Sequence, residues 1–172
     1  TRAEKMIVLG DGAAWIWGIA DEHFHGAIQI VDLYHAREHL AGLGKVLYGP
    51  LSTQSKTWTA ARCEELDAGE VERVVIAMGR VRPQEEKAKE EIRKAVLYFQ
   101  TNSERMRYAR FRSQGLFVGS GVVEAGCKTI IGRRLKQSGM RWTVRGANAI
   151  IALRCCELSG RWEEFWEARS VG

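Results

Sequence analysis

Two acidic residues in this 172-residue chain stand where carboxylates commonly carry out chemistry. Asp11 directly follows a short apolar run, and Glu124 stands in the opening turns of an otherwise basic helical stretch. Carboxylate oxygens suit Mg²⁺, and two such ions held by three acids catalyse phosphoryl transfer. Asp11 and Glu124 are therefore candidate catalytic residues and candidate ligands of Mg²⁺ or Mn²⁺, and this role requires their side chains to lie close together.

Glu124 also has an explanation that involves no chemistry. An acid in the first turns complements the helix dipole, and Glu124 with Lys128 forms a favourable pair four residues apart. Each effect contributes roughly a few tenths of a kcal/mol. The helix alone favours this structural explanation, so the catalytic one depends on partner carboxylates elsewhere.

Asp32 is a further acid that directly follows an apolar run, Ala27 to Val31 (AIQIV). It could be the third acid of a two-metal site. His35 follows three residues later, however, and an Asp-x-x-His pair at a strand-to-helix junction favours a buried hydrogen-bonded brace. We predict that Asp32 and His35 form such a structural brace and bind no catalytic metal.

A zinc site is an alternative that the histidines suggest, because His35 and His39 have helical spacing and His23 and His25 lie upstream. The HxxxH pair has no intervening catalytic Glu and no evident third ligand, so a solvated helix face is the commoner explanation. The four cysteines show no CxxC spacing, which predicts buried, reduced thiols and a cytoplasmic protein. No stretch approaches the ~20 apolar residues of a membrane span, so no membrane partner is expected.

The positive charge of the chain is concentrated in one segment. The whole chain carries a net charge of +5, whereas residues 125–161 contain eight basic residues and one acidic residue, a net charge of +7. Residues 62–107 hold equal numbers of basic and acidic residues, as a solvated helical surface does. The basic segment predicts a polyanion site, with these DNA-binding candidates: Lys128, Arg133, Arg134, Lys136 and Arg141.

The elements that must position these residues begin with a β-α-β unit. Lys5 to Gly10 (KMIVLG) and Ala27 to Val31 are typical of buried parallel strands, and Ala13 to Ala20 of a helix with Trp15 and Ile19 on one face. A crossover helix makes the two strands parallel and brings Asp11 and Asp32 to the same edge of the sheet, where open α/β sheets build their sites.

The middle of the chain has helical periodicity. Leu33 to Leu40 continues as a helix, which Gly42, Gly44, Gly49 and Pro50 are expected to break. Three helices are then predicted at 58–67, 70–78 and 84–112, the last with these core positions: Ile92, Val96, Phe99, Met106 and Phe111. Beyond Ser120 a helix is expected with an apolar stripe at Val123, Cys127, Ile131 and Leu135, and another at about 146–158.

Four sequence blocks together resemble bacterial insertion-sequence transposases of the DDE superfamily, of the ISKra and ISLre type in the Mutator-like lineage. The blocks are GDGAAWIW (10–17), IVDLYHAREHL (30–40), YFQTNSERMRYARFRSQGLFVGSGVVEAGCK (98–128) and RLKQSGMRW (134–142). The resemblance implies an α/β, ribonuclease-H-like catalytic domain at 1–40 and 113–172, interrupted by an all-helical insertion at 41–112. It further implies that Asp11 is the second acid of the catalytic triad and Glu124 the third, and that Asp32-x-x-His35 matches a (Cys/Asp)-x-x-His element.

The activity that the resemblance implies is Mg²⁺-dependent DNA strand cleavage and strand transfer in transposition. The first acid of such enzymes lies upstream of Asp11, so the chain resembles the carboxyl-terminal part of a transposase that is incomplete by itself. Expected partners are double-stranded DNA, as transposon ends and target, and a second copy in a homodimer, in the bacterial nucleoid. The alternative is a catalytically dead remnant that binds DNA non-specifically.

Overall fold

The computed structural model describes residues 5–168, and within this range it leaves the side chains of residues 122–124 undescribed. The chain divides into two compact units, Thr1–Ser120 and Gly121–Gly172. The described residues are mostly helical, with one small parallel sheet. Among them, no helix combines the length and the apolar character needed to cross a bilayer.

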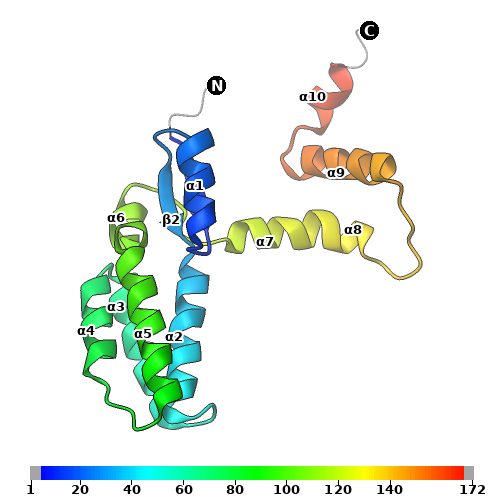
Figure 1. The fold of residues 1–172 in the computed structure, drawn as a ribbon. Helices are drawn as coiled ribbons and strands as arrows, with labels where there is room; N and C mark the ends of the chain where they lie inside the picture. The colour runs from blue at the N-terminus through cyan, green and yellow to red at the C-terminus, as the bar shows by residue number, and fades with distance from the viewer. Residues whose placement is uncertain (1–4, 169–172) are drawn as a thin grey trace. The chain divides into compact units, whose positions relative to one another are not determined.

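The first unit begins with the predicted β-α-β arrangement (Figure 1). Strand β1 (Ile7–Gly10) pairs in parallel with β2 (Ile28–Val31), and helix α1 (Ala14–His23) connects them. Gly10 lies opposite Val31 in this register, so both strands end at the same edge. The parallel pairing predicted from the apolar runs is therefore confirmed.

Helix α1 turns to the core the face opposite to the one that carries Trp15 and Ile19. Trp17 and Ala20 are buried, whereas Trp15 and Ile19 are exposed. The sequence of α1 is apolar on nearly all sides, so periodicity could not decide which face turns inward. Packing decides it, because Trp17 lies against Gly10 at the end of β1 and its indole N–H donates to Asn102.

Four helices follow the sheet and form a bundle in which each contacts its sequence neighbour and the last contacts the first (Figure 1). They are α2 (Leu33–Tyr48), α3 (Thr53–Asp67), α4 (Val71–Arg80) and α5 (Glu86–Thr101). The expected breaks at Gly42 and Gly44 are wrong, because α2 runs through both to Tyr48. The expected break at Gly49 is confirmed, because this residue directly follows the helix with a φ of 90°. Gly44 is buried where α2 crosses α3. Ala36, Leu40 and Leu43 of the same helix are also buried, on the side of α2 that packs in the bundle.

The single long helix predicted for residues 84–112 is instead three elements. Helix α5 ends at Thr101, a 3₁₀ turn η1 spans Ser103–Met106, and α6 spans Tyr108–Ser113. The interruption falls at Asn102, whose side-chain amide bonds the carbonyl of Tyr98 and so competes with helical hydrogen bonding. The predicted core positions hold nonetheless: Phe99, Met106 and Phe111 are buried, and Ile92 and Val96 pack against them in part.

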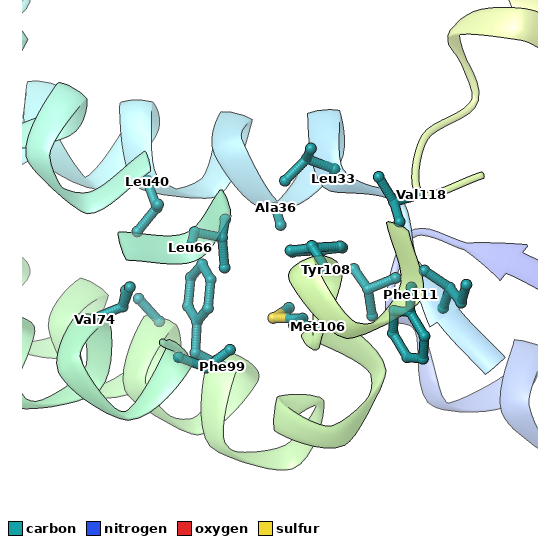
Figure 2. Packing of buried hydrophobic residues seen from close by; sticks show 14 of the residues in the cluster. Leu33, Ala36, Leu40, Leu66, Val74, Phe99, Met106, Tyr108, Phe111 and Val118 are labelled. Atoms are coloured by element: carbon teal, nitrogen blue, oxygen red, sulfur yellow. The ribbon is translucent and has the colours of Figure 1, made fainter. Parts of the chain in front are cut away.

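The core of the first unit lies where the helical bundle meets the sheet (Figure 2). It contains side chains from α2, α3, α4 and α5 together with Met106, Tyr108, Phe111 and Val118. The Leu33 amide donates to the carbonyl of Val118, so the segment after α6 returns to the junction of β2 and α2. The two parts that the sequence separated as catalytic domain and insertion thus share one core within this unit.

The second unit begins with a continuous helical stretch made of α7 (Gly121–Cys127), a π-helical turn η2 (Lys128–Gly132) and α8 (Arg133–Leu135). Helices α9 (Val144–Leu158) and α10 (Trp162–Glu167) follow. The guanidinium of Arg154 on α9 donates to the carbonyls of Thr129 and Ile130, at 2.9 and 3.1 Å. This contact joins α9 to the π-helical turn.

The apolar stripe predicted along the start of this unit is not buried. Cys127 is exposed, and Ile131 and Leu135 are only half-buried, while Val123 lies outside the described side chains. Among the described residues of the unit, none is buried. A unit of about fifty residues buries a small fraction of its surface, so few of its side chains are expected to be enclosed completely. The four cysteines were also expected to be buried, but Cys127 and Cys155 are exposed and Cys63 and Cys156 are only half-buried.

Candidate functional site

Asp11 lies at the carboxyl end of β1 with its carboxylate exposed. Its Oδ1 accepts a hydrogen bond from the backbone N–H of Ala13 at 2.9 Å, which turns the chain from the strand into α1. In the part of the chain that the structure describes, Oδ2 has no protein partner. The carboxylate is thus fixed at one oxygen and open at the other, as an acid that binds a ligand must be.

Asp32 occupies the equivalent place after β2, but its carboxylate is fully used by the protein. It is only 8% exposed. Oδ1 accepts from the N–H of Tyr34 at 2.8 Å and caps α2, and Oδ2 accepts from the N–H of Ser120 at 2.9 Å. Asp32 therefore joins the start of α2 to the end of the first unit, and its oxygens face amides rather than solvent.

His35 is not the partner that holds Asp32. Within the described residues the two side chains share no hydrogen bond; His35 Nδ1 lies 3.7 Å from Glu38 Oε2, and its ring lies 4.9 Å from that of His39. The partner that sequence reasoning missed is Ser120. A backbone amide leaves no side-chain signature, and only the flanking glycines of Gly119-Ser120-Gly121 hinted at a close approach. A Cβ on Gly119 would lie 2.8 Å from the Tyr34 ring.

The loop that carries Asp11 is held by α5, which sequence reasoning assigned to a separate insertion. The Tyr98 hydroxyl donates to the backbone carbonyl of Asp11 at 2.8 Å, and Asn102 Nδ2 lies 3.4 Å from the carbonyl of Gly12. Burial raises the pKa of Tyr98, and the charges of Asp11 and Asp32 add to this effect. The hydroxyl thus keeps its proton and remains a donor.

His39 completes the surroundings of Tyr98. The two rings stack at 4.2 Å with an interplanar angle of 20°. Partial burial and the neighbouring His35 lower the pKa of His39, against the opposite effects of Asp11 and Glu38. The imidazole is therefore neutral at neutral pH. His39 and Tyr98 also line a groove of about 410 Å³ between α2 and α5.

The second predicted acid, Glu124, belongs to α7, but its side chain lies outside the described residues. Its closeness to Asp11 stays a prediction. Among the described residues, no group of three or more His, Cys, Asp or Glu side chains could hold a metal ion. Asp11 is thus a single exposed carboxylate with one open oxygen, and its role as a ligand of Mg²⁺ stays a prediction.

The basic residues of the second unit differ in how the protein uses them. Arg154 bonds backbone carbonyls and Arg161 pairs with Glu164 at 3.0 Å, so both have roles within the unit. The five residues predicted to bind DNA are all exposed, and none is in an ion pair with another described residue. They are Lys128, Arg133, Arg134, Lys136 and Arg141.

Comparison with known proteins assigns the sequence to one family. No curated protein and no solved structure matches the chain. A family model described as an uncharacterised protein family, UPF0236, matches residues 1–169. Because this match extends over almost the whole sequence, the chain belongs to the UPF0236 family.

Proposed function

We propose that this chain is a segment of a DDE-type transposase that catalyses Mg²⁺-dependent DNA strand cleavage and strand transfer. The observation that carries the proposal is the contrast between the two aspartates at one edge of the parallel sheet. Asp32 is closed by two backbone amides, whereas Asp11 keeps an open oxygen. This contrast supports Asp11 as the second acid and a structural role for Asp32.

The position of Glu124 in the chain supports it as the third acid. The amide of Ser120 is tied to Asp32, and β2, which ends at Asp32, pairs directly with β1. Glu124 follows Ser120 by four residues, so the chain keeps their α-carbons within about 14 Å of each other whatever the orientation of the second unit. Glu124 is thus the acidic residue nearest in sequence to Ser120, the residue whose amide holds Asp32.

Asp11 and Glu124, with an acid upstream of this chain, would hold the metal, which supplies Lewis-acid activation of the nucleophile and of the leaving oxygen when it is bound. The protein's own part is to fix the carboxylates and to bind the DNA. The five exposed cations of the second unit suit the phosphates of double-stranded transposon ends and target. Two copies of the protein would form a homodimer that holds two transposon ends.

A strand-transfer assay tests the proposal with a polypeptide extended upstream to include the first acid. The substrate is a matched transposon end, with Mg²⁺ or Mn²⁺. Asp11→Asn and Glu124→Gln are each expected to lower strand transfer by about a hundredfold or more, because metal ions contribute several kcal/mol to the transition state. DNA binding, measured on the same preparations, should change little.

Asp21→Asn is the matched control, because Asp21 is an exposed aspartate on α1 whose partner is Gln29. It should keep full activity. If activity survives Glu124→Gln, Glu124 is not a catalytic residue. Its role is then to stabilise the helix through the helix dipole and the pair with Lys128. A correctly folded extended protein that binds DNA but transfers no strand, with every acid in place, would support the alternative of a DNA-binding remnant.

A further inference from the structure

The exposed carboxylate of Asp11 stands on the loop between β1 and α1, and one helix holds the first two backbone carbonyls of this loop. Tyr98 and Asn102, four residues apart at the end of α5, contact the successive carbonyls of Asp11 and Gly12. We propose that Tyr98 and Asn102 are positioning residues that fix the Asp11–Gly12 loop and so aim the Asp11 carboxylate at its metal. The inference rests on the proposed function, since it assigns Asp11 a ligand to orient.

The orientation of the Asn102 side chain is fixed by its surroundings. Asn102 is 2% exposed, and its Oδ1 accepts from the indole N–H of Trp17 at 3.1 Å. Its Nδ2 faces two carbonyl oxygens, those of Tyr98 at 3.1 Å and Gly12 at 3.4 Å. An amide satisfies one donor and two acceptors in this arrangement, which neither an aspartate nor an apolar residue can do. The side chain therefore links α1, α5 and the Asp11 loop.

Tyr98 and Gly12 fit each other so closely that each restricts the other. Gly12 has a φ of 97°, and a Cβ at this position would lie 2.6 Å from the Tyr98 ring. The ring also stacks on His39, and Phe99 meets its edge at 5.3 Å. The Tyr98 ring is thus held by packing, and its hydroxyl can fix the Asp11 carbonyl without moving.

Attachment of α5 to the core does not by itself require these two polar contacts. Ala95 and Phe99 of α5 are already buried in the main cluster. Both polar contacts instead end on the two peptide carbonyls beside a single exposed carboxylate. Partners that orient a metal ligand commonly affect metal affinity strongly when they are removed, by about 10- to 100-fold.

The test measures Mn²⁺ binding by this chain through paramagnetic broadening of its backbone amide NMR signals. In the wild-type chain, the signals of residues 11–13 are expected to broaden first, and Asp11→Asn should abolish this selectivity. Tyr98→Phe keeps the stacked ring and removes only the donor. It should raise the Mn²⁺ concentration for half-broadening by about tenfold, with a thermal midpoint close to that of the wild type. Asn102→Ala is expected to have a similar effect on Mn²⁺ binding.

Tyr108→Phe is the matched control, because the buried Tyr108 hydroxyl has no hydrogen-bond partner among the described residues. It should bind Mn²⁺ as the wild type does. If Asp11→Asn abolishes the broadening but Tyr98→Phe and Asn102→Ala bind like the wild type, the positioning role is overturned and the proposed function stands. Equal weakening by Tyr98→Phe and Tyr108→Phe also overturns it. If residues 11–13 do not broaden selectively in the wild type, Asp11 binds no metal in this chain and the positioning role is overturned. The strand-transfer assay with the extended polypeptide then decides the proposed function separately.

Discussion

Two aspartates after two paired strands have different uses because different backbone amides surround them. Asp11 meets one amide, that of Ala13, and keeps an oxygen open to solvent. Asp32 meets two amides, one of them from a segment 88 residues away in the sequence. A carboxylate that accepts hydrogen bonds at both oxygens and is shielded from water has a structural role.

At the same scale, Asp32→Asn should destabilise the protein. The substitution puts an NH₂ donor where one of two amides now meets an oxygen, which leaves a nearly buried N–H unpaired. We expect the free energy of unfolding to fall by about 1–3 kcal/mol in urea denaturation. Asp21→Asn on the exposed face of α1 is the control, with a change within about 0.5 kcal/mol. An Asp32→Asn protein as stable as the wild type would refute the structural role.

At the scale of elements, α2 shows that the effect of a glycine on helix packing depends on the residues around it. Gly42 faces open space along the α2–α5 groove, and a Cβ there would meet nothing within 4 Å. A Cβ on Gly44 would lie 2.5 Å from Thr59 Oγ1 and 3.2 Å from Ser55 Oγ on α3. Gly44 therefore allows the two helices to approach closely, whereas Gly42 has no packing role in the described structure.

We expect the substitution of alanine for these two glycines to change the free energy of unfolding in opposite directions. Gly42→Ala should raise the free energy of unfolding by about 0.5–1 kcal/mol, because alanine has the higher helix propensity. Gly44→Ala should lower it by about 1–3 kcal/mol, because the added methyl overpacks the contact with α3. Urea denaturation of both variants measures the difference. Equal effects of the two substitutions would contradict this account of α2.

An ion-pair cluster links α4 to η1 and gives stability a pH dependence. Arg107 contacts Glu72 of α4 at 2.5 and 2.8 Å, and Glu104 of η1 at 2.7 Å. The hydrogen bond from Arg107 lowers the pKa of Glu72 from 4.5 to about 2. Because the folded-state pKa is the lower one, the stabilisation is complete above the unfolded pKa and is lost as the pH falls from about 4.5 through about 2.

The measurement compares the free energy of unfolding of the wild type and of Glu72→Gln between pH 7 and pH 2. Glu72 is 61% exposed, so solvent screening limits the expected difference to about 1 kcal/mol at neutral pH. The difference should shrink towards zero at about pH 2. Glu64→Gln is the control on α3, since Glu64 is exposed and in no ion pair among the described residues. A difference that persists unchanged at pH 2 would exclude the Arg107 pair as its cause.

At the scale of the whole molecule, the two units differ in buried residues and in exposed positive charge. Every buried residue among those described lies between Trp17 and Val118 in the first unit. The second unit carries five exposed cations without ion pairs among the described residues. Stability is thus concentrated in the first unit, and the second is suited to contact a polyanion.

Binding of duplex DNA should therefore be strongly salt-dependent and have little sequence preference. Replacing Arg133, Arg134 and Lys136 by glutamine should weaken binding to the same extent on unrelated sequences. The slope of log affinity against log salt should fall by about 0.9 for each phosphate that the variant no longer neutralises. Fluorescence anisotropy at several salt concentrations measures it. Replacing Arg154 should instead lower the stability of the second unit, and a triple variant that keeps the wild-type slope would move the DNA site elsewhere.

The sequence by itself determined the elements whose patterns are local. Apolar runs ending at Asp11 and Asp32 were enough to predict two parallel strands with a helix between them, because buried strands and their connections obey period and handedness rules. The core positions Phe99, Met106 and Phe111 followed from helical spacing in the same way. The resemblance to transposases then singled out Asp11 and Glu124, which remain predictions as catalytic residues.

Only the tertiary structure decided what depends on contacts between distant segments. The inward face of α1 and the close approach of α2 to α3 at Gly44 are each set by a neighbour from elsewhere in the chain. The same holds for Asp32, whose partner is the amide of Ser120 rather than the nearby His35. Backbone amides and close approaches of glycine leave almost no trace in residue type. The position of the apolar runs could therefore identify the two aspartates. It could not show that both oxygens of Asp32 accept hydrogen bonds from backbone amides, whereas one oxygen of Asp11 stays exposed.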